Sequence, residues 1–98
     1  MEEVVVSTKK TIAALSNATI FPNPLREMGT LQFDLSEKTD LHIRIFDLSG
    51  KEIKTIFEGA KVKGQQQIEF DVNGLSSGFY FIQIKSDEGQ TAMKFEKL

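Results

Sequence analysis

The chain of 98 residues has no cysteine, no tryptophan and only one histidine, and each absence removes a class of function. Without cysteine there is neither a disulfide framework nor a thiolate metal site. The absence does not indicate the cellular compartment, because a domain of this size can be stable without disulfide bonds. His42 has no second histidine or cysteine with which to complete a zinc site. With one tyrosine and no tryptophan, the chain is poorly supplied with side chains that stack on sugars.

Long apolar runs and an excess of one charge are also missing. No stretch approaches the roughly 20 apolar residues that span a bilayer, so we expect no membrane insertion. The net charge of -2 gives no general attraction to nucleic acid or to anionic membranes. A signal peptide is not expected, because Met1-Glu2-Glu3 is acidic and Val4-Val5-Val6 is too short for an apolar region.

No motif in the sequence indicates catalysis or a cofactor. A Gly-x-Ser-x-Gly segment, a glycine-rich phosphate loop and an Asp-x-Asp-x-Asp-Gly run are all absent. Calcium binding in a loop is left open by aspartates in turns and at outward strand positions. His42 lies on the polar side of its strand and is interpreted as a solvated surface residue. The sequence therefore predicts a protein that is not an enzyme and needs no cofactor.

Alternation of apolar and polar residues is the main pattern present. It predicts half-buried strands at 31–35, 41–45, 68–72 and 80–84, and less regular strands at 18–21, at 52–57 and from Gln90 onward. Turns separate these segments every eight to twelve residues or so, and no helical pattern is convincing. The sequence therefore predicts an all-β, immunoglobulin-like Greek-key β-sandwich of about seven antiparallel strands.

The predicted connections have distinct turn chemistry. Asp47-Leu48-Ser49-Gly50 is a turn in which aspartate bonds the backbone two residues on and glycine accepts a positive φ. Residues 59–64 are predicted to be a hairpin loop, and 86–89 the final turn. Asn73-Gly74 is predicted to begin a longer connection, with Leu75 turned inward and Gly78 leading into the next strand. Pro22 and Pro24 remove two backbone donors and predict a rigid corner.

The residue pattern also predicts a domain boundary and surfaces that could contact other molecules. Residues 1–16 have a weak pattern and are predicted to be a linker, with residues 17–98 as the domain. Phe46, Phe79 and Phe81 oppose the core positions of their strands and could form an exposed patch for a partner. We favour the alternative, in which the strand ends twist or Pro22 and Leu25 cover these rings. Edge strands can accept another strand, so weak self-association through them is a further expectation.

Five segments together resemble a known family. They occur in this order: Phe21-Pro22-Asn23-Pro24, Leu31-Gln32-Phe33-Asp34-Leu35, Ile45-Phe46-Asp47-Leu48-Ser49-Gly50-Lys51, Leu75-Ser76-Ser77-Gly78-Phe79-Tyr80-Phe81, and Lys94 near the end. The set resembles the type A C-terminal sorting domain of the type IX (Por) secretion system of Bacteroidetes, over roughly residues 17–98.

The resemblance implies a function in secretion. Such a domain is the last module of a larger exported protein, so the linker would join it to an upstream cargo domain. It would pass through the periplasm and be recognised by the outer-membrane translocon, which delivers the cargo to the cell surface or the medium. In many members a surface sortase removes the domain, and here such processing would fall around residues 7–18.

The resemblance also assigns roles to residues. Pro22, Asn23, Pro24, Asp47, Gly50, Gly78 and Tyr80 match family motifs and are interpreted as structural. Recognition by the translocon is expected in the last strand, at Lys94, Phe95, Glu96, Lys97 and Leu98. Family tails often end in a basic residue followed by apolar ones, whereas Glu96 and Lys97 separate Phe95 from Leu98 here. The alternative function is a passive immunoglobulin-like accessory or carbohydrate-binding module of a secreted enzyme.

Overall fold

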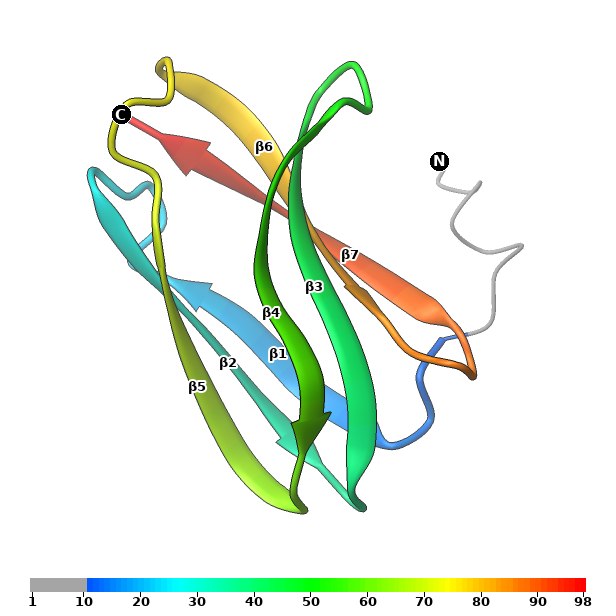
Figure 1. Ribbon diagram of the computed structural model, residues 1–98. Helices are drawn as coiled ribbons and strands as arrows, with labels where there is room; N and C mark the ends of the chain where they lie inside the picture. Colours follow the sequence, from blue (N-terminus) through cyan, green and yellow to red (C-terminus); the bar gives the residue numbers. More distant parts are fainter. Residues whose placement is uncertain (1–10) are drawn as a thin grey trace.

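The computed structural model describes residues 11–98, and every regular element within them is a strand (Figure 1). The bounds are β1 Leu15–Phe21, β2 Met28–Leu35, β3 Thr39–Asp47, β4 Glu52–Lys61, β5 Gly64–Asp71, β6 Gly78–Lys85 and β7 Gln90–Lys97. The predicted all-β class with seven strands is confirmed.

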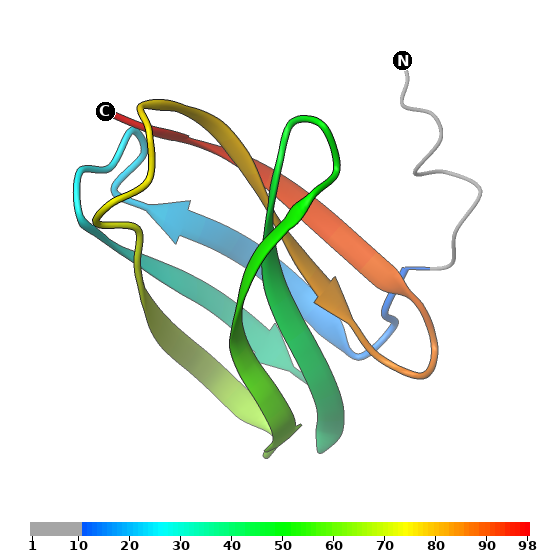
Figure 2. The ribbon, with the colours of Figure 1, turned by 45° about the horizontal axis from the view of Figure 1, so that its top comes forward.

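The strands form two sheets that face each other, as Figures 1 and 2 show. One sheet has the order β1-β2-β5 and the other β4-β3-β6-β7, and all neighbouring strands are antiparallel. The chain crosses between the sheets after β2, β4 and β5 and forms hairpins elsewhere. This arrangement agrees with the predicted immunoglobulin-like sandwich.

The core lies between the two sheets and is filled by alternate residues of each strand. The inward side chains of β2, β3 and β6 are almost fully buried: Leu31, Phe33, Leu35, Leu41, Ile43, Ile45, Tyr80, Ile82 and Ile84. Burying one such large apolar side chain is worth about 1.5–3 kcal/mol relative to exposure. The alternation found in the sequence therefore identified the core faces correctly, because a period of two places every second side chain on one face.

The packed domain begins earlier than the sequence predicts. Ile12 and Ala14 are only 3% and 6% exposed and belong to the core, and the N–H of Ser36 donates to the carbonyl of Ala14 at 2.8 Å. The predicted boundary between residues 16 and 17 is therefore wrong. These residues close the end of the sandwich through tertiary contacts, which leave no periodic pattern in so short a segment. The rest of the predicted linker, residues 1–10, lies outside the described residues.

The predicted hairpin loop at residues 59–64 is also wrong. Strand β4 continues through Gly59, which pairs with Leu41, and ends at Lys61. Only residues 62 and 63 separate it from β5, which belongs to the other sheet. The two glycines that suggested a loop instead have positive φ values of 142° and 120° within the strands, a conformation that glycine adopts at little steric cost.

The turn between β3 and β4 follows the predicted chemistry. Asp47 Oδ1 accepts hydrogen bonds from the Ser49 backbone N–H at 2.9 Å, the Ser49 hydroxyl at 2.7 Å and the Lys51 N–H at 3.0 Å. Gly50 has a φ of 90° and its N–H donates to the Asp47 carbonyl. The hydrogen bond from the Ser49 hydroxyl is the main reason that the pKa of Asp47 lies below its ordinary value of 3.8.

The connection between β5 and β6 is long, as predicted, and is fastened by Tyr80. Leu75 is half-buried against the core, and Gly78 enters β6 with a φ of 147°. The Tyr80 hydroxyl donates to the carbonyl of Ser76 at 2.6 Å, and its ring stacks on Phe95 with centroids 5.8 Å apart. Tyr80 therefore joins the core to the connection that precedes its own strand.

Replacing Tyr80 by alanine is expected to lower the free energy of unfolding by about 3 kcal/mol, because a buried ring is removed from the core. Tyr80→Phe keeps the ring and loses only the hydroxyl bond to Ser76, so its expected cost is about 1 kcal/mol. Chemical denaturation measures both values. A loss below about 1 kcal/mol for the alanine variant would show that Tyr80 is not in the core.

Asp47 is expected to stabilise the turn only while its carboxylate is ionised. Because folding lowers this pKa, the stabilisation is present above the pKa of the unfolded chain and is lost as the pH falls through the folded pKa. The difference in melting temperature between the wild type and Asp47→Asn should therefore be constant above about pH 5 and shrink below about pH 4.

The control for this measurement is Asp87→Asn, because no described residue donates a hydrogen bond to the Asp87 carboxylate. Melting temperatures for Asp47→Asn that run parallel to those of the wild type from about pH 7 to about pH 3 would contradict the prediction.

Candidate functional site

The last strand, β7, lies at the edge of the larger sheet (Figure 1). It pairs with β6 in an unbroken register from Gly78 opposite Lys97 to Lys85 opposite Gln90. In an antiparallel pair, alternate residues turn their backbone N–H and C=O groups away from the partner strand. The outer edge of β7 therefore presents backbone groups that need another partner.

At its C-terminal end, this edge is covered by residues 22–25, which we call the proline corner. The N–H of Glu96 donates to Asn23 Oδ1 at 3.1 Å, and the N–H of Leu25 donates to the carbonyl of Glu96 at 2.9 Å. The N–H of Leu98 donates to the carbonyl of Leu25 at 2.8 Å. Leu25 and Lys97 thus form a short parallel bridge, and the last residues are held extended.

The proline corner is anchored in the core by Leu25, whose side chain is only 1% exposed. It packs over Gly29, where an added Cβ would lie 2.7 Å from Leu25 Cδ2 and 2.6 Å from Phe70 Cζ. Because Gly29 has no side chain, Leu25 and Phe70 can pack against its backbone. The backbone that holds the end of β7 is consequently fixed by the same core that holds the sheets together.

The predicted recognition residues divide into two groups. Phe95 is 1% exposed and packs against Phe70, with ring centroids 5.6 Å apart. Its predicted role in direct recognition is therefore corrected, because its side chain is inaccessible on the folded domain. Lys94 and Leu98 are exposed, and Glu96 and Lys97 are half-buried. These four, which we call the tail residues, can present their side chains to a partner.

The family-motif residues gather at one end of the sandwich. Strands β1, β3, β5 and β7 all run toward this end, which contains the connections 22–27, 48–51 and 72–77 together with Leu98 (Figures 1 and 2). We call it the tail end. Pro22, Asn23, Pro24, Asp47, Gly50 and Gly78 lie there, and Tyr80 lies two residues into β6. The motifs that are separate in sequence therefore form one region.

Sequence reasoning missed the contact between Asn23 and Glu96. The two residues are 73 positions apart, and nothing in the local pattern of either segment indicates the other. The proline motif was predicted to form a corner, and the chain does turn there between β1 and β2. The structure adds that the residue between the prolines supplies the acceptor for a backbone N–H near the end of the chain.

Cations lie over two of the three outer aromatic rings. Phe46 and Phe81 are half-buried and lie opposite each other on β3 and β6, and the Arg44 guanidinium lies 4.9 Å from the Phe46 ring centroid. Lys94 Nζ lies 4.7 Å from the centroid of Phe79, which stays 43% exposed. The predicted cover by Leu25 is wrong, because this side chain points into the core.

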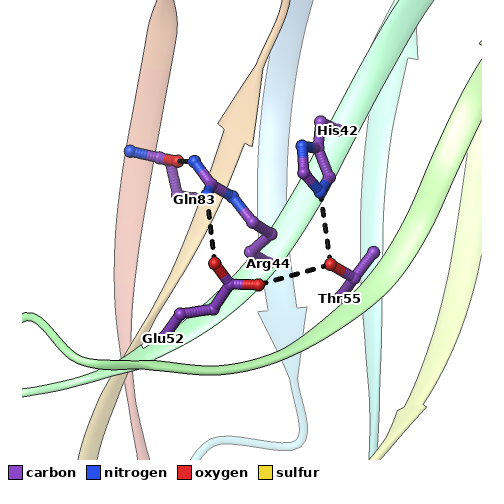
Figure 3. Close-up of polar contacts among 5 residues, drawn as sticks. All are labelled: His42, Arg44, Glu52, Thr55 and Gln83. Carbon is purple, nitrogen blue, oxygen red and sulfur yellow. Dashed lines mark hydrogen bonds and ion pairs between the residues drawn. The ribbon is translucent and has the colours of Figure 1, made fainter.

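A row of polar side chains crosses the outer face of the larger sheet (Figure 3). Thr55 Oγ1 lies 3.2 Å from His42 Nε2 and 3.5 Å from Glu52 Oε2, while Arg44 contacts both Glu52, at 3.2 Å, and Gln83. His42 is therefore half-buried and bonded rather than simply solvated, which corrects its predicted state. Within residues 11–98, no three histidine, aspartate or glutamate side chains are grouped to hold a metal ion.

Two solved structures from Porphyromonas gingivalis share this fold. Dimeric latent PorU superposes with a TM-score of 0.65 at 22% identity, over 89% of this chain and 10% of PorU. PorZ, a bacterial surface component of the type IX secretion system, gives a TM-score of 0.57 at 17% identity, over 84% of this chain and 11% of PorZ. The chain thus spans about a tenth of either protein. No curated protein matches it in sequence.

A match to a protein family covers most of the chain. Residues 19–97 match the family described as "Secretion system C-terminal sorting domain". In this family the domain is the C-terminal signal for type IX secretion, and sorted proteins pass through the periplasm to the cell surface or beyond. This finding favours a sorting role over a passive accessory module. The chain therefore belongs to the family of secretion system C-terminal sorting domains.

Proposed function

We propose that the outer-membrane translocon recognises this domain through the tail residues Lys94, Glu96, Lys97 and Leu98. The proposal rests on the hydrogen bonds between the proline corner and the end of the chain, which we call the clasp. It fixes the backbone of the last residues through hydrogen bonds to Glu96 and Leu98. A segment held in its bound conformation loses less entropy on binding than a free one, so the clasp would make the tail a better ligand.

The alternation of β7 supports this division of roles. Phe95 faces the core, while its neighbours Lys94 and Glu96 face outward. The same strand can therefore close the sandwich with one face and offer charged side chains with the other. Charged side chains that a partner pairs in a specific geometry contribute more to specificity than to bulk attraction.

We further propose that the domain follows a cargo domain in a larger exported protein. The linker to that cargo precedes Ile12, because Ile12 and Ala14 are packed and Leu15 already pairs with Leu35. A surface sortase would then cut before Ile12, where cleavage leaves the packed domain intact. Weak self-association through the part of the β7 edge that the proline corner does not cover stays a prediction.

The tail can be tested with the chain fused behind an exported reporter in a host that has type IX secretion. Lys94→Ala with Lys97→Ala is expected to lower surface delivery by about tenfold, because loss of a charge-assisted contact of about 1.5 kcal/mol corresponds to that factor. Lys63→Ala with Lys85→Ala is the matched control, which removes the same charge from exposed sites away from the tail end. Equal delivery by the two double variants would contradict the proposal.

The clasp can be tested by amide hydrogen exchange. Asn23→Ala removes the acceptor for the Glu96 N–H, so exchange at Glu96 is expected to accelerate by about tenfold, equivalent to about 1.4 kcal/mol of lost protection. The Leu98 N–H, which bonds to the Leu25 carbonyl, is an internal reference within the same segment.

Asn73→Ala is the control variant for this measurement, because the Asn73 side chain is exposed in the β5–β6 connection and has no hydrogen bond to β7. Unchanged exchange at Glu96 in Asn23→Ala would show that Asn23 does not hold the tail.

A further inference from the structure

The exposed large apolar side chains are distributed unevenly between the two ends of the sandwich. Among the described residues there are six of them, and Val62 is the one at the end opposite the tail. The other five belong to the tail end, with exposed fractions of 41–60%: Phe21, Met28, Leu48, Phe79 and Leu98. Single exposed apolar residues are normal on a protein surface, but a concentration of them in one region marks an interaction site.

The family motifs fix the positions of most of these side chains. Phe21 directly precedes the proline corner, and Leu48 lies inside the turn that Asp47 and Gly50 form. Phe79 follows Gly78, and Pro24 and Phe79 line the same shallow hollow with Lys94. Leu98 is fastened to the proline corner by its backbone N–H. Turns that look purely structural therefore also determine where apolar side chains are presented.

The charges at the tail end indicate what kind of partner fits. Charged residues of both signs belong to this end, with Arg26, Lys51 and Lys97 positive and Glu27 and Glu96 negative. An anionic membrane surface or a nucleic acid would be matched by an excess of positive charge. Apolar side chains surrounded by a polar rim are instead the arrangement found at interfaces with other proteins.

The direction of the chain supports an end-on contact. The first packed residues, Ile12 and Ala14, lie at the end of the sandwich opposite the tail, where the Ala14 carbonyl accepts the N–H of Ser36. The chain thus reaches β1 from the far end, and the five apolar side chains at the tail end stay 41–60% exposed. A partner can therefore approach this end without meeting residues 11–14, through which the chain enters β1.

We infer that the whole tail end, and not the last strand alone, is the docking surface, and that it binds an apolar concave surface of the translocon end-on. The inference rests on the proposed recognition by the translocon and extends it from the four tail residues to three connections of the sandwich. The signal is then conformational, because Phe21, Met28 and Phe79 come to the same end of the sandwich as Leu98 only through folding. A peptide with the sequence of the last strand would lack most of the surface.

The test uses the full 98-residue chain fused behind an exported reporter. The variant Met28→Ser/Phe79→Ser/Leu98→Ser removes apolar side chains from three parts of the tail end and leaves Lys94, Glu96 and Lys97 in place. Val62→Ser is the matched control, because Val62 is 66% exposed at the opposite end. Surface delivery is expected to fall by about tenfold or more for the triple variant and by less than about twofold for the control.

Chemical denaturation of all variants separates docking from folding. The three single variants are measured as well, so that a loss of stability in the triple variant does not decide the result. Wild-type delivery by folded single and triple variants would overturn the inference and leave recognition by the tail residues standing. Failure of the wild-type chain itself to deliver the reporter would overturn the proposed function.

Two further comparisons test where the docking surface lies and whether it binds a protein or a lipid surface. A loss in the Val62→Ser variant equal to that of the triple variant would overturn the assignment to the tail end. The chain is also mixed with vesicles of phosphatidylglycerol and phosphatidylcholine and sedimented. Vesicle binding that the triple variant abolishes would assign the apolar side chains to a lipid surface and overturn a protein partner, whereas wild-type chain left in the supernatant supports it.

Discussion

The ring of Phe95 lies between the two sheets, in edge contact with Phe70 of β5 and stacked on Tyr80 of β6. Much of the tail end depends on this packing. Phe70 also limits the space over Gly29 that Leu25 occupies, so the proline corner is positioned by the same cluster. Tyr80 continues the cluster to Ser76, in the connection that leads to β6. One aromatic group therefore links the last strand, the proline corner and a third connection.

This arrangement explains how a short C-terminal strand serves both stability and recognition. An edge strand with free backbone groups tends to fray or to pair with other chains. Here the core holds the strand through Phe95, and the proline corner satisfies its outer edge at Glu96 and Leu98. The outward side chains of the same residues are left for a partner. The division follows from the two-residue period of a strand, which separates neighbours onto opposite faces.

Much of the fold was predictable because it rests on local pattern. Alternation marked the inward faces of β2, β3, β5 and β6, and the Asp47–Gly50 turn followed from side-chain chemistry within four residues. The errors occurred where tertiary contact outweighed local pattern. Ile12 and Ala14 look like linker until the sandwich closes over them, and Gly59 suggests a loop until it pairs with Leu41. Phe95 was assigned to recognition because it lies in the terminal strand. Its position in the sequence does not show that its ring is buried between the sheets.

The sequence by itself determined the class of fold, the strands that form the core and the resemblance to a sorting domain, because these depend on periodicity, turn residues and the order of short motifs. Only the tertiary structure decided which motif residues act together. Asn23 and Glu96 are joined across 73 positions, and four exposed apolar residues far apart in sequence share one end of the sandwich with Leu98. Such long-range neighbours are fixed by sheet topology and by the register of paired strands, which no local segment encodes.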